Sequence, residues 1–402
     1  MTILVLNCGS SSLKYQLLDM TNDEVYDLKA KGLVERIGME MGHLVHKPEG
    51  KEKFEVEKPI ADHTVAVRAV LDALLDENHG VLKTLKDIDA VGHRVLHGGP
   101  TIFKSMLVDD NVEDTIEKCF DLGPLHNPAN LRGIKAVKEV LPGVPQVAVF
   151  DTAFHQSMPA QAYLYALPYE YYEKYGIRKY GFHGTSHRYV SARGIKFAGL
   201  DPDNSKVITC HLGNGSSIAA VLNGKCYDTS MGLTPLDGLT MGTRCGAIDP
   251  AVVTYIENKE GKTPAEMDVL MNKKSGLLGI SGVSSDLRDV LGAADGGNER
   301  AKLAVKKLVF DIIKYVGSYA AEMNGVDLIV FTGGIGENNA KIRKAIMDNL
   351  TYLGVEIDEE ANAQRADEIL LTLPSSKVKV AVIATNEELM IARDTMNITK
   401  KN

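Results

Sequence analysis

Two short stretches rich in glycine and serine are the first residues whose types and spacing point to chemistry. One spans residues 7–12, after the apolar run Ile3–Leu6, and the other spans residues 211–217, after Val207–Cys210. Small residues let the backbone approach an anion closely, while N–H and hydroxyl groups supply hydrogen-bond donors. We therefore predict that both turns contact phosphate, with Lys14 as an added positive charge beyond the first.

A third glycine-rich stretch covers residues 333–338, after a predicted strand at Leu328–Phe331 and before a predicted helix at Ala340–Leu350. This context favours a nucleotide-binding loop. It lacks the third glycine of the Rossmann fingerprint, and no GKS or GKT of a Walker A loop occurs in the chain. Protein-kinase signatures are absent as well. A nucleotide would therefore be held by another phosphate-binding architecture.

Two arginines stand beside glycines. Arg94 lies in the stretch His93–Gly99, and Arg244 lies in Gly242–Gly246. The planar guanidinium fork matches the geometry of carboxylate and phosphate, so an anionic ligand is one interpretation. The alternative is a structural arginine that ties loop carbonyls together.

A dense polar loop is predicted at residues 180–187, where His183 and His187 stand four apart. Two histidines at this spacing can hold a metal on a helix. The intervening Gly184 weakens that helix, so zinc is not expected.

The elements that position these stretches alternate between strand and helix. Strands are predicted at Ile3–Leu6, Leu13–Leu18, Val207–Cys210, Ile218–Leu222 and Val147–Phe150. Helices are predicted at Leu131–Leu141, with Asn127 as cap and Pro128 at the first position, and from Asn386-Glu387 onward. Leu6, Gly9, Ser10 and Ser11 match Leu212, Gly215, Ser216 and Ser217 at a constant offset, which indicates an internal duplication.

Length and composition limit the number of domains, the kinds of partner and the cellular compartment that we expect. The chain has 402 residues, which favours two domains. Its net charge of -8 argues against a broad nucleic-acid footprint. No apolar run is long enough for a signal peptide or a membrane span. Five scattered cysteines favour reduced thiols and a cytoplasmic location.

Taken together, the stretches resemble the acetate kinase family along nearly the whole chain. The matching segments, in order, are residues 6–14, 93–99, 151–155, 180–187, 211–217, 241–249, 331–338 and 385–388. The resemblance implies an α/β fold of two duplicated ribonuclease-H-like domains, as in actin, Hsp70 and sugar kinases, facing a central cleft. It implies transfer of the ATP γ-phosphoryl group to acetate, with Mg²⁺ (or Mn²⁺) as metal and a homodimer as assembly. We expect an acceptor-side domain at residues 1–150 plus 386–402 and a nucleotide-binding domain at 151–385.

The resemblance also implies roles for individual residues. Catalytic roles fall to Arg94, Asp151, His183 and Arg244, and metal binding to Asn7 and Glu387. The acceptor pocket would contain Arg94, Leu96, Leu125, Phe182 and Pro235. ATP or ADP would contact Ser10, Ser12, Lys14, His211, Leu212, Gly213, Asn214, Gly215, Asp286, Leu287, Arg288, Gly334, Ile335, Gly336, Glu337 and Asn338.

Two departures from the family pattern bear on specificity. Leu96 stands where many members have valine, which favours acetate over longer acids. Leu287 stands where some members carry an aromatic residue, which weakens the expected selection among nucleotides. Asp151 is expected to position arginines or metal-bound water, although the family account makes it a proton acceptor. Rival functions are a propionate kinase, an Hsp70-type ATPase switch and an actin-like subunit.

Overall fold

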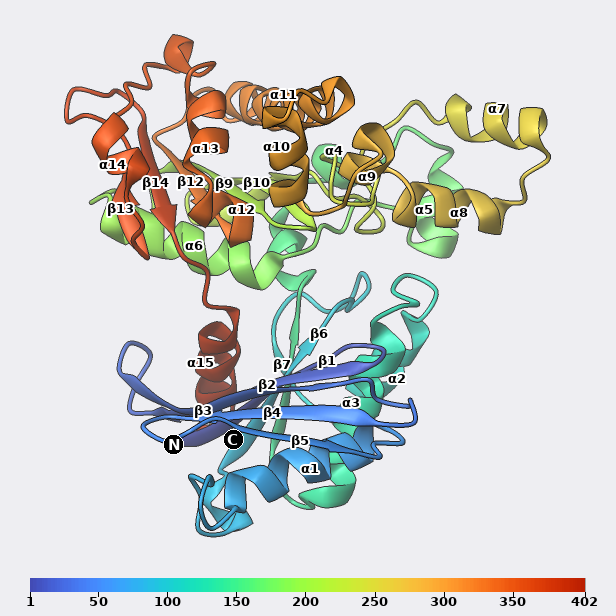
Figure 1. The fold of residues 1–402 in the computed structure, drawn as a ribbon, viewed down its shortest axis with the longest axis vertical. Coiled ribbons are helices and arrows are strands. Elements are labelled where there is room, and N and C mark those ends of the chain that lie inside the picture. Colours follow the sequence, from blue (N-terminus) through green and yellow to red (C-terminus); the bar gives the residue numbers. More distant parts are fainter. Residues whose placement is uncertain (402) are drawn as a thin grey trace. The chain divides into compact units, whose positions relative to one another are not determined.

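The computed structural model describes residues 1–401 as two compact units. Unit 1 comprises Met1–Phe154 and Asn386–Asn402, and unit 2 comprises His155–Thr385. Each unit contains one mixed sheet covered by helices, which confirms the α/β class (Figure 1).

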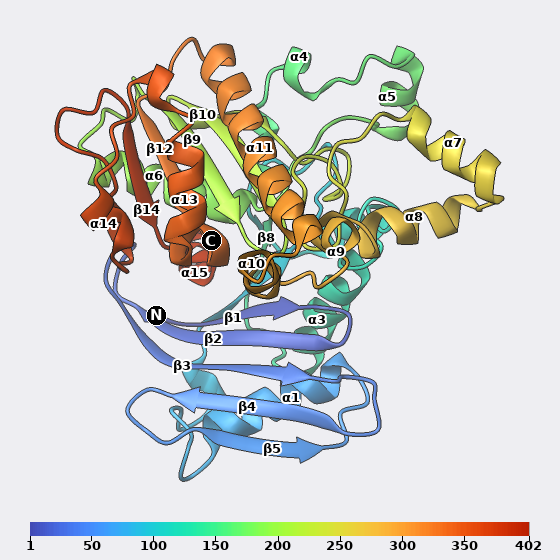
Figure 2. The same cartoon turned by 45° about the horizontal axis from the view of Figure 1, so that its top comes forward.

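Unit 1 is built on an eight-stranded sheet with the order β5-β4-β3-β2-β1-β6-β8-β7. The first five strands pair antiparallel in chain order (Figure 2). Strand β6 pairs in parallel with β1, and β8 pairs in parallel with β6. The strands are β1 Thr2–Cys8, β2 Ser12–Met20, β3 Tyr26–Glu35, β4 Gly42–Pro48, β5 Phe54–Lys58, β6 Ala90–Val95, β7 Met106–Leu107 and β8 Gln146–Phe150. The helices are α1 His63–Leu75, α2 Asp110–Lys118, α3 Asn127–Val140 and α15 Glu387–Thr399.

Unit 2 is built on a six-stranded sheet with the order β11-β10-β9-β12-β14-β13. Its strands are β9 Lys206–Leu212, β10 Ser216–Leu222, β11 Lys225–Thr229, β12 Leu328–Thr332, β13 Glu368–Leu370 and β14 Lys379–Ile383. Its helices are α4 Ala160–Tyr163, α5 Tyr169–Tyr175, α6 Gly184–Phe197, α7 Ala251–Glu260, α8 Pro264–Lys273, α9 Gly276–Ser281, α10 Leu287–Asp295, α11 Glu299–Glu322, α12 Gly333–Asn338, α13 Ala340–Met347 and α14 Glu359–Ala363.

The two sheets share one topology, which confirms the predicted duplication. The order β3-β2-β1-β6-β8 in unit 1 matches β11-β10-β9-β12-β14 in unit 2, and in each the last three strands are parallel. The constant offset of the predicted repeat is wrong in detail. The closing pair Cys8↔Leu13 encloses residues 9–12, whereas Leu212↔Ser216 encloses residues 213–215, so the second turn is one residue shorter.

The helices that follow the last parallel strands pack in a reciprocal way. Helix α6 follows β8 along the chain but packs on β9, β12 and β14 of unit 2. Helix α15 follows β14 but packs on β6, β1, β2 and β8 of unit 1. The C-terminal helix is therefore a structural part of unit 1, and it brings Glu387 to that unit.

The local predictions hold for most elements. All predicted strands form, and the final helix begins at Glu387 with Asn386 as its side-chain cap. Asn127 as a helix cap is wrong. Its carboxamide instead bonds the backbone N–H and C=O of His97 and the carbonyl of Ile116, which are buried groups that need hydrogen-bond partners.

Among the helices of residues 1–401, none is both long and apolar enough to cross a membrane.

The contact between β6 and α15 generates a test of how unit 1 is held together. A Cβ on Gly92 would lie 2.5 Å from Thr395 Oγ1 and 2.6 Å from Ile391 Cγ2 on α15. We expect Gly92→Ala to destabilise the protein by about 1–3 kcal/mol, because overpacking forces the helix away from the sheet. Urea unfolding monitored by circular dichroism measures the change.

Gly292→Ala in α10 is the matched control, because a Cβ there would meet nothing within 4 Å. It should be neutral or slightly stabilising. Equal midpoints for the two variants would contradict tight packing of α15 on β6.

Candidate active site

In unit 1 the parallel strands β6 and β8 end at a buried ion pair. Arg94 Nη2 lies 2.6 Å from Asp151 Oδ2, and Arg94 Nε lies 3.1 Å from Asp151 Oδ1. Asp151 is fully buried, while the Arg94 side chain keeps 22% of its exposure. Asp151 also raises the pKa of Arg94. The carboxylate therefore fixes the guanidinium in one orientation with one edge still accessible.

Two further groups gather at this ion pair. Arg94 Nη1 donates to Asn7 Oδ1 at 3.4 Å. Burial raises the pKa of Glu387 to about 7, against the opposing charge of Arg94. Asp151 and Glu388 add to this rise as nearby negative charges. A cation bound here would offset that repulsion.

The donor set at this point suits Mg²⁺. Asn7 and Glu387 offer an amide and a carboxylate oxygen, and Mg²⁺ prefers oxygen ligands while keeping several waters. No group of three or more His, Cys, Asp or Glu side chains arranged for metal binding occurs within residues 1–401. A site with one or two protein ligands plus water and phosphate does not require such a group.

The other residues predicted on the unit 1 side occupy varied surroundings. Ser10 lies in the turn between β1 and β2, and Ser12 is the first residue of β2; Gly9 N closes the turn by donating to the Ser12 carbonyl at 2.8 Å. Leu96 is 5% exposed and packs beside Gly123, whereas Leu125 is 61% exposed. Their exposures differ sharply, so their predicted roles in an acceptor pocket stay predictions.

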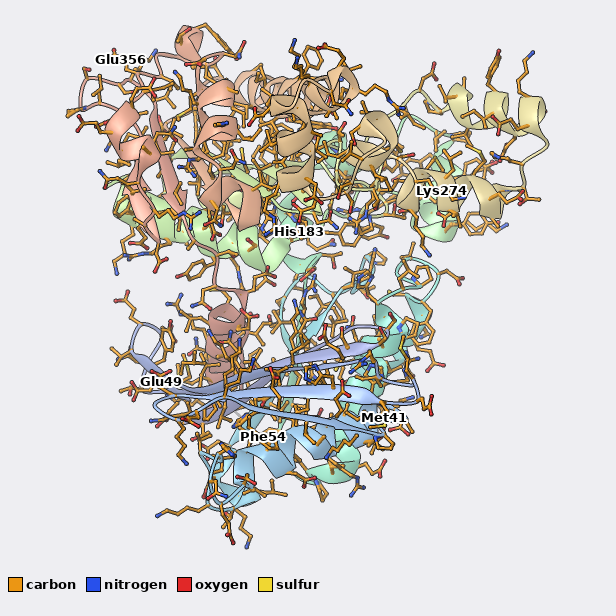
Figure 3. All side chains as sticks on the ribbon, viewed as in Figure 1. Met41, Glu49, Phe54, His183, Lys274 and Glu356 are labelled. Carbon is orange, nitrogen blue, oxygen red and sulfur yellow. The ribbon has the colours of Figure 1, made fainter. Side chains whose placement is uncertain are left out.

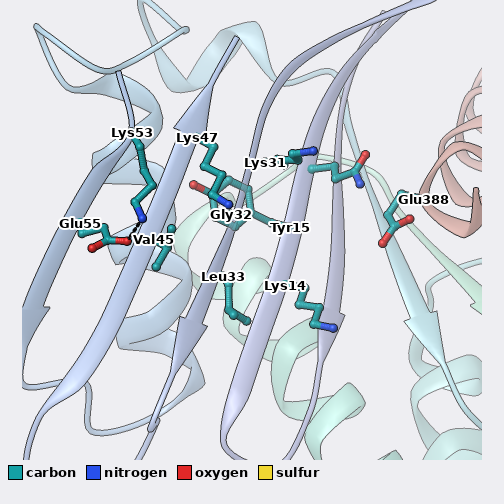
Figure 4. Close-up of a pocket in the computed structure, with 11 residues that line it drawn as sticks. Lys14, Tyr15, Lys31, Gly32, Leu33, Val45, Lys47, Lys53, Glu55 and Glu388 are labelled. Carbon is teal, nitrogen blue, oxygen red and sulfur yellow. Dashed lines mark ion pairs between the residues drawn. The ribbon is translucent and has the colours of Figure 1, made fainter. Parts of the chain in front are cut away.

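Lysines border a shallow pocket on the open face of β2–β5 (Figure 4). Lys31 and Lys47 pair directly across β3 and β4, and Lys14 and Glu388 line the same pocket. Lys53 forms an ion pair with Glu55 on the edge strand. Exposed charges on an edge keep a sheet from pairing with another chain, which accounts for Lys53, whereas Lys14, Lys31 and Lys47 lie on the inner strands β2, β3 and β4.

In unit 2 the turn between β9 and β10 lies against two cationic or polar side chains. A Cβ on Gly215 would lie 3.4 Å from Arg244 Nη1 and 3.7 Å from His183 Nε2. The glycine therefore leaves a small space that both side chains border. Three residues far apart in sequence meet here, at the edge of the second phosphate-type turn.

Arg244 is held without a counter-charge. Its Nη1 donates to the Pro235 carbonyl at 3.2 Å, and burial lowers the pKa of the guanidinium. Within the described part of unit 2, no carboxylate lies within ion-pair distance of it. A half-buried charge without a partner is costly, so this position favours an anionic ligand.

His183 and its neighbours form a hydrogen-bonded cluster. His183 (labelled in Figure 3) precedes α6 with a left-handed φ of 56°, and its Nδ1 lies 2.9 Å from Ser217 Oγ. Its ring stacks on His211 at 4.3 Å between centroids. The predicted loop at residues 180–187 is wrong at its end, because α6 already begins at Gly184. Packing on β9, β12 and β14 outweighs the weak helix propensity of glycine.

The residues predicted to hold the nucleoside start two helices. Asp286 caps α10 by accepting from Arg288 N at 2.8 Å, and its ion pair with Arg288 lowers the pKa of Asp286 to about 2. Leu287 is buried in the core of unit 2. The predicted loop at Gly333–Asn338 is instead the short helix α12, in which Glu337 Oε1 accepts from Gly333 N.

Other predicted side chains also point inward. Leu212 and Phe182 are buried, and a buried Arg343 donates to the carbonyls of Gly336 and Glu337. Gly334 has open space around it, and Asn214 is exposed in the turn.

The structure thus brings the predicted residues together in two groups. Unit 1 gathers Asn7, Arg94, Asp151 and Glu387, and unit 2 gathers His183, His211, Gly215 and Arg244. Sequence reasoning assigned no individual role to Thr209, Ser186 or Glu388, and it placed Ser217 only within the second predicted phosphate turn. The structure shows that Ser217 contacts the rings of both His183 and His187.

Comparison with known proteins gives one consistent result. The sequence model of the acetokinase family matches residues 2–393. The chain is 57% identical to acetate kinase 2 of Clostridium perfringens over 401 residues, covering 100% of both chains. Its structure is similar to that of Porphyromonas gingivalis acetate kinase, with a TM-score of 0.95, 50% identity and 99% of each chain covered. It is also similar to a Francisella tularensis propionate kinase, with a TM-score of 0.91, 45% identity and 99% of each chain covered.

The unpaired guanidinium of Arg244 generates a test that needs no turnover. Sulfate should raise the Tm of the wild type by roughly 2–4 °C more than NaCl at equal ionic strength, which corresponds to about 1 kcal/mol of binding. Arg244→Ala should lose most of this specific increment. Differential scanning calorimetry over a sulfate series measures it.

Lys302→Ala is the control, because Lys302 is exposed, already paired with Glu299 and assigned no role in the site. An unchanged sulfate response in Arg244→Ala would show that Arg244 binds no anion.

Proposed function

Since the chain belongs to the acetokinase family, we propose that it catalyses reversible transfer of the γ-phosphoryl group of ATP to acetate, giving acetyl phosphate and ADP. The observation that carries this proposal is Arg244, a half-buried guanidinium without a carboxylate partner in its unit. Both substrates are anions, and the transferring group is an anion in every state of the reaction. An Hsp70-type switch or an actin-like subunit would leave this charge unexplained.

Unit 2 would supply the groups around the transferring phosphoryl. Arg244 Nη1 and His183 Nε2 border the same space beside Gly215. Donors aimed at the equatorial oxygens stabilise the charge that spreads over them in the transition state. The residues of the second turn, 211–215, would contact phosphates, and the starts of α10 and α12 would hold the nucleoside.

Unit 1 would supply the acceptor side. Arg94 is fixed by Asp151 and keeps an accessible edge that can receive a carboxylate. Acetate has a carboxyl pKa near that of glutamate, about 4.3, so it has no proton to lose at neutral pH. We therefore assign Asp151 to orienting Arg94 rather than to general base catalysis.

Asn7 and Glu387 would hold Mg²⁺, whose charge would offset that of the β- and γ-phosphates when it is bound. The hydrogen bond from Arg94 to Asn7 and the electrostatic influence of Arg94 and Asp151 on the pKa of Glu387 support this assignment. Ser10, Ser12 and Lys14 would line the phosphate side of unit 1.

A propionate kinase is the second candidate, favoured by the similarity to the Francisella tularensis protein of that name. The relatives at 57% and 50% identity named acetate kinase favour acetate. Leu96 would narrow the pocket that takes the alkyl end of the acceptor.

We also propose a homodimer in the cytoplasm. Helices α5 and α7 bury none of their residues and lie at the same end of unit 2 (Figures 1 and 2). They expose Tyr169, Tyr171, Tyr175, Val252 and Tyr255. Exposed aromatic side chains of this kind are enriched at protein interfaces, and a second copy is the partner that the family suggests. Four of the five cysteines are buried as free thiols, in keeping with a reducing compartment.

The size of Leu96 generates a prediction on specificity. We expect kcat/KM to fall from acetate to propionate to butyrate, by roughly tenfold per step, since one methylene alters discrimination by about 1–3 kcal/mol. A hydroxylamine trap for acyl phosphates with ATP and Mg²⁺ measures each acceptor. Leu96→Val should flatten the series, and a flat or rising series in the wild type would contradict the assignment to acetate.

The Arg94–Asp151 pair generates a prediction on catalysis. Asp151→Asn keeps the shape but loses the charge that orients Arg94, so kcat should fall strongly without reaching background. The KM for acetate should rise as well. Asp228→Asn, which removes a buried partner of Lys179 elsewhere, controls for general loss of stability. Complete loss of activity together with loss of an acid limb in the pH profile would establish Asp151 as the base.

A further inference from the structure

The backbone of His183 is held in a conformation that non-glycine residues rarely adopt. Its φ of 56° is left-handed, at the residue that precedes α6. The side chain makes no capping bond to the helix and is directed to Ser217 instead. Strained residues of this kind persist where the surrounding structure fixes them, and they cluster at functional sites.

Behind His183 a chain of hydrogen bonds runs into the core of unit 2. His183 Nδ1 lies 2.9 Å from Ser217 Oγ, and Ser217 Oγ lies 2.7 Å from His187 Nε2. His187 Nδ1 lies 2.7 Å from Thr209 Oγ1. Thr209, Ser217 and His187 are all fully buried, so no water competes for these contacts.

The number of protons on these four side chains determines which atom donates and which accepts in each hydrogen bond. Burial, with His155 and His211 nearby, lowers the pKa of His187 well below its ordinary value, so its ring is neutral and has a single N–H. If that proton is on Nε2, His187 donates to Ser217, Ser217 donates to His183 Nδ1, and Thr209 donates to His187 Nδ1. The three buried donors, on His187, Ser217 and Thr209, then each have an acceptor, and the remaining N–H of His183 is on Nε2.

The opposite direction leaves one donor without an acceptor. His183 Nδ1–H would donate to Ser217, Ser217 to His187 Nε2, and His187 Nδ1–H to Thr209. The hydroxyl proton of Thr209 would then need another acceptor, and among the described residues Thr209 Oγ1 has no second partner. A buried donor without an acceptor carries the full cost of its desolvation.

We infer that Thr209, His187 and Ser217 are positioning residues that hold His183 as its Nε2–H tautomer. The Nε2–H then faces the space beside Gly215 that Arg244 also borders. The catalytic effect of this tautomer rests on the proposed function: a fixed N–H donor at that point would bond an equatorial oxygen of the transferring phosphoryl group. The N-terminus of α6 also disfavours a positive charge on the ring, in keeping with a neutral donor.

The test reads the tautomer directly, without substrate. Long-range ¹H–¹⁵N correlation spectra of the full-length protein labelled with ¹⁵N-histidine distinguish Nε2–H, Nδ1–H and cationic rings, and His183→Asn identifies the signals of His183. We expect Nε2–H in the wild type at pH 7.5. Thr209→Val, which keeps the side-chain shape, should populate the Nδ1–H tautomer of His183 although it does not touch that ring.

Thr229→Val is the matched control, because Thr229 is equally buried and donates only to the Ile218 carbonyl. It should leave the spectrum of His183 unchanged. A cationic or Nδ1–H His183 in the wild type, or an identical His183 spectrum in Thr209→Val, would overturn the inference.

Kinetics then separate the inference from the proposed function. Thr209→Val should lower kcat by roughly two- to tenfold, the range of one hydrogen bond, with little change in the KM for ATP. Ser217→Ala should lower it further, and Ser217→Thr should restore part of the loss because it returns the hydroxyl. A tautomer shift without any fall in kcat would support the hydrogen-bond chain but would show that His183 has no role in the proposed mechanism.

Discussion

The half-buried guanidinium of Arg244 has no carboxylate within ion-pair distance in its own unit, and the surrounding loops are shaped to keep it there. A Cβ on Gly242 would lie 1.8 Å from Asn214 Oδ1 and 2.9 Å from the carbonyl oxygen of Ser285, so glycine lets the Arg244 loop pack closely at the second turn. Gly246 has a φ of 70°, which a residue with a side chain adopts only at a cost. Arg244 therefore lacks the carboxylate partner that a buried arginine ordinarily has in a protein. An anionic substrate can supply that negative charge.

The two arginines differ in the groups that surround them. Each unit presents a hairpin turn beside parallel strands, but in unit 1 the strand end after β8 carries Asp151, which neutralises and orients Arg94. In unit 2 the corresponding turn is one residue shorter and borders Arg244 and His183 instead. One arginine is therefore fixed by the protein, and the other is held ready for a ligand. That asymmetry suits a reaction that must bind one anion firmly while stabilising charge that moves on another.

The sequence predicted six of the fourteen strands within residues 1–401 and the duplication, because these depend on local patterns. Apolar runs mark β1, β9 and β12, and glycines beside an arginine mark the site loops. The failures share a physical cause. Asn127 was misread as a cap because its tertiary partners at His97 and Ile116 are distant in sequence. The roles of Thr209 and Ser217 were likewise invisible, since the two lie on adjacent antiparallel strands and meet only through His187 on α6.

The central claim is that Arg244 acts on the transition state rather than on ground-state binding. Steady-state kinetics of Arg244→Ala, with ATP and acetate varied separately, tests it most directly. We predict that kcat falls by about 10²–10³, as when one preorganised donor is lost, while the KM for ATP changes little. Arg244→Lys should recover little activity, because an ammonium does not reproduce the planar fork. A near-normal kcat with weaker binding of acetate alone would contradict the account.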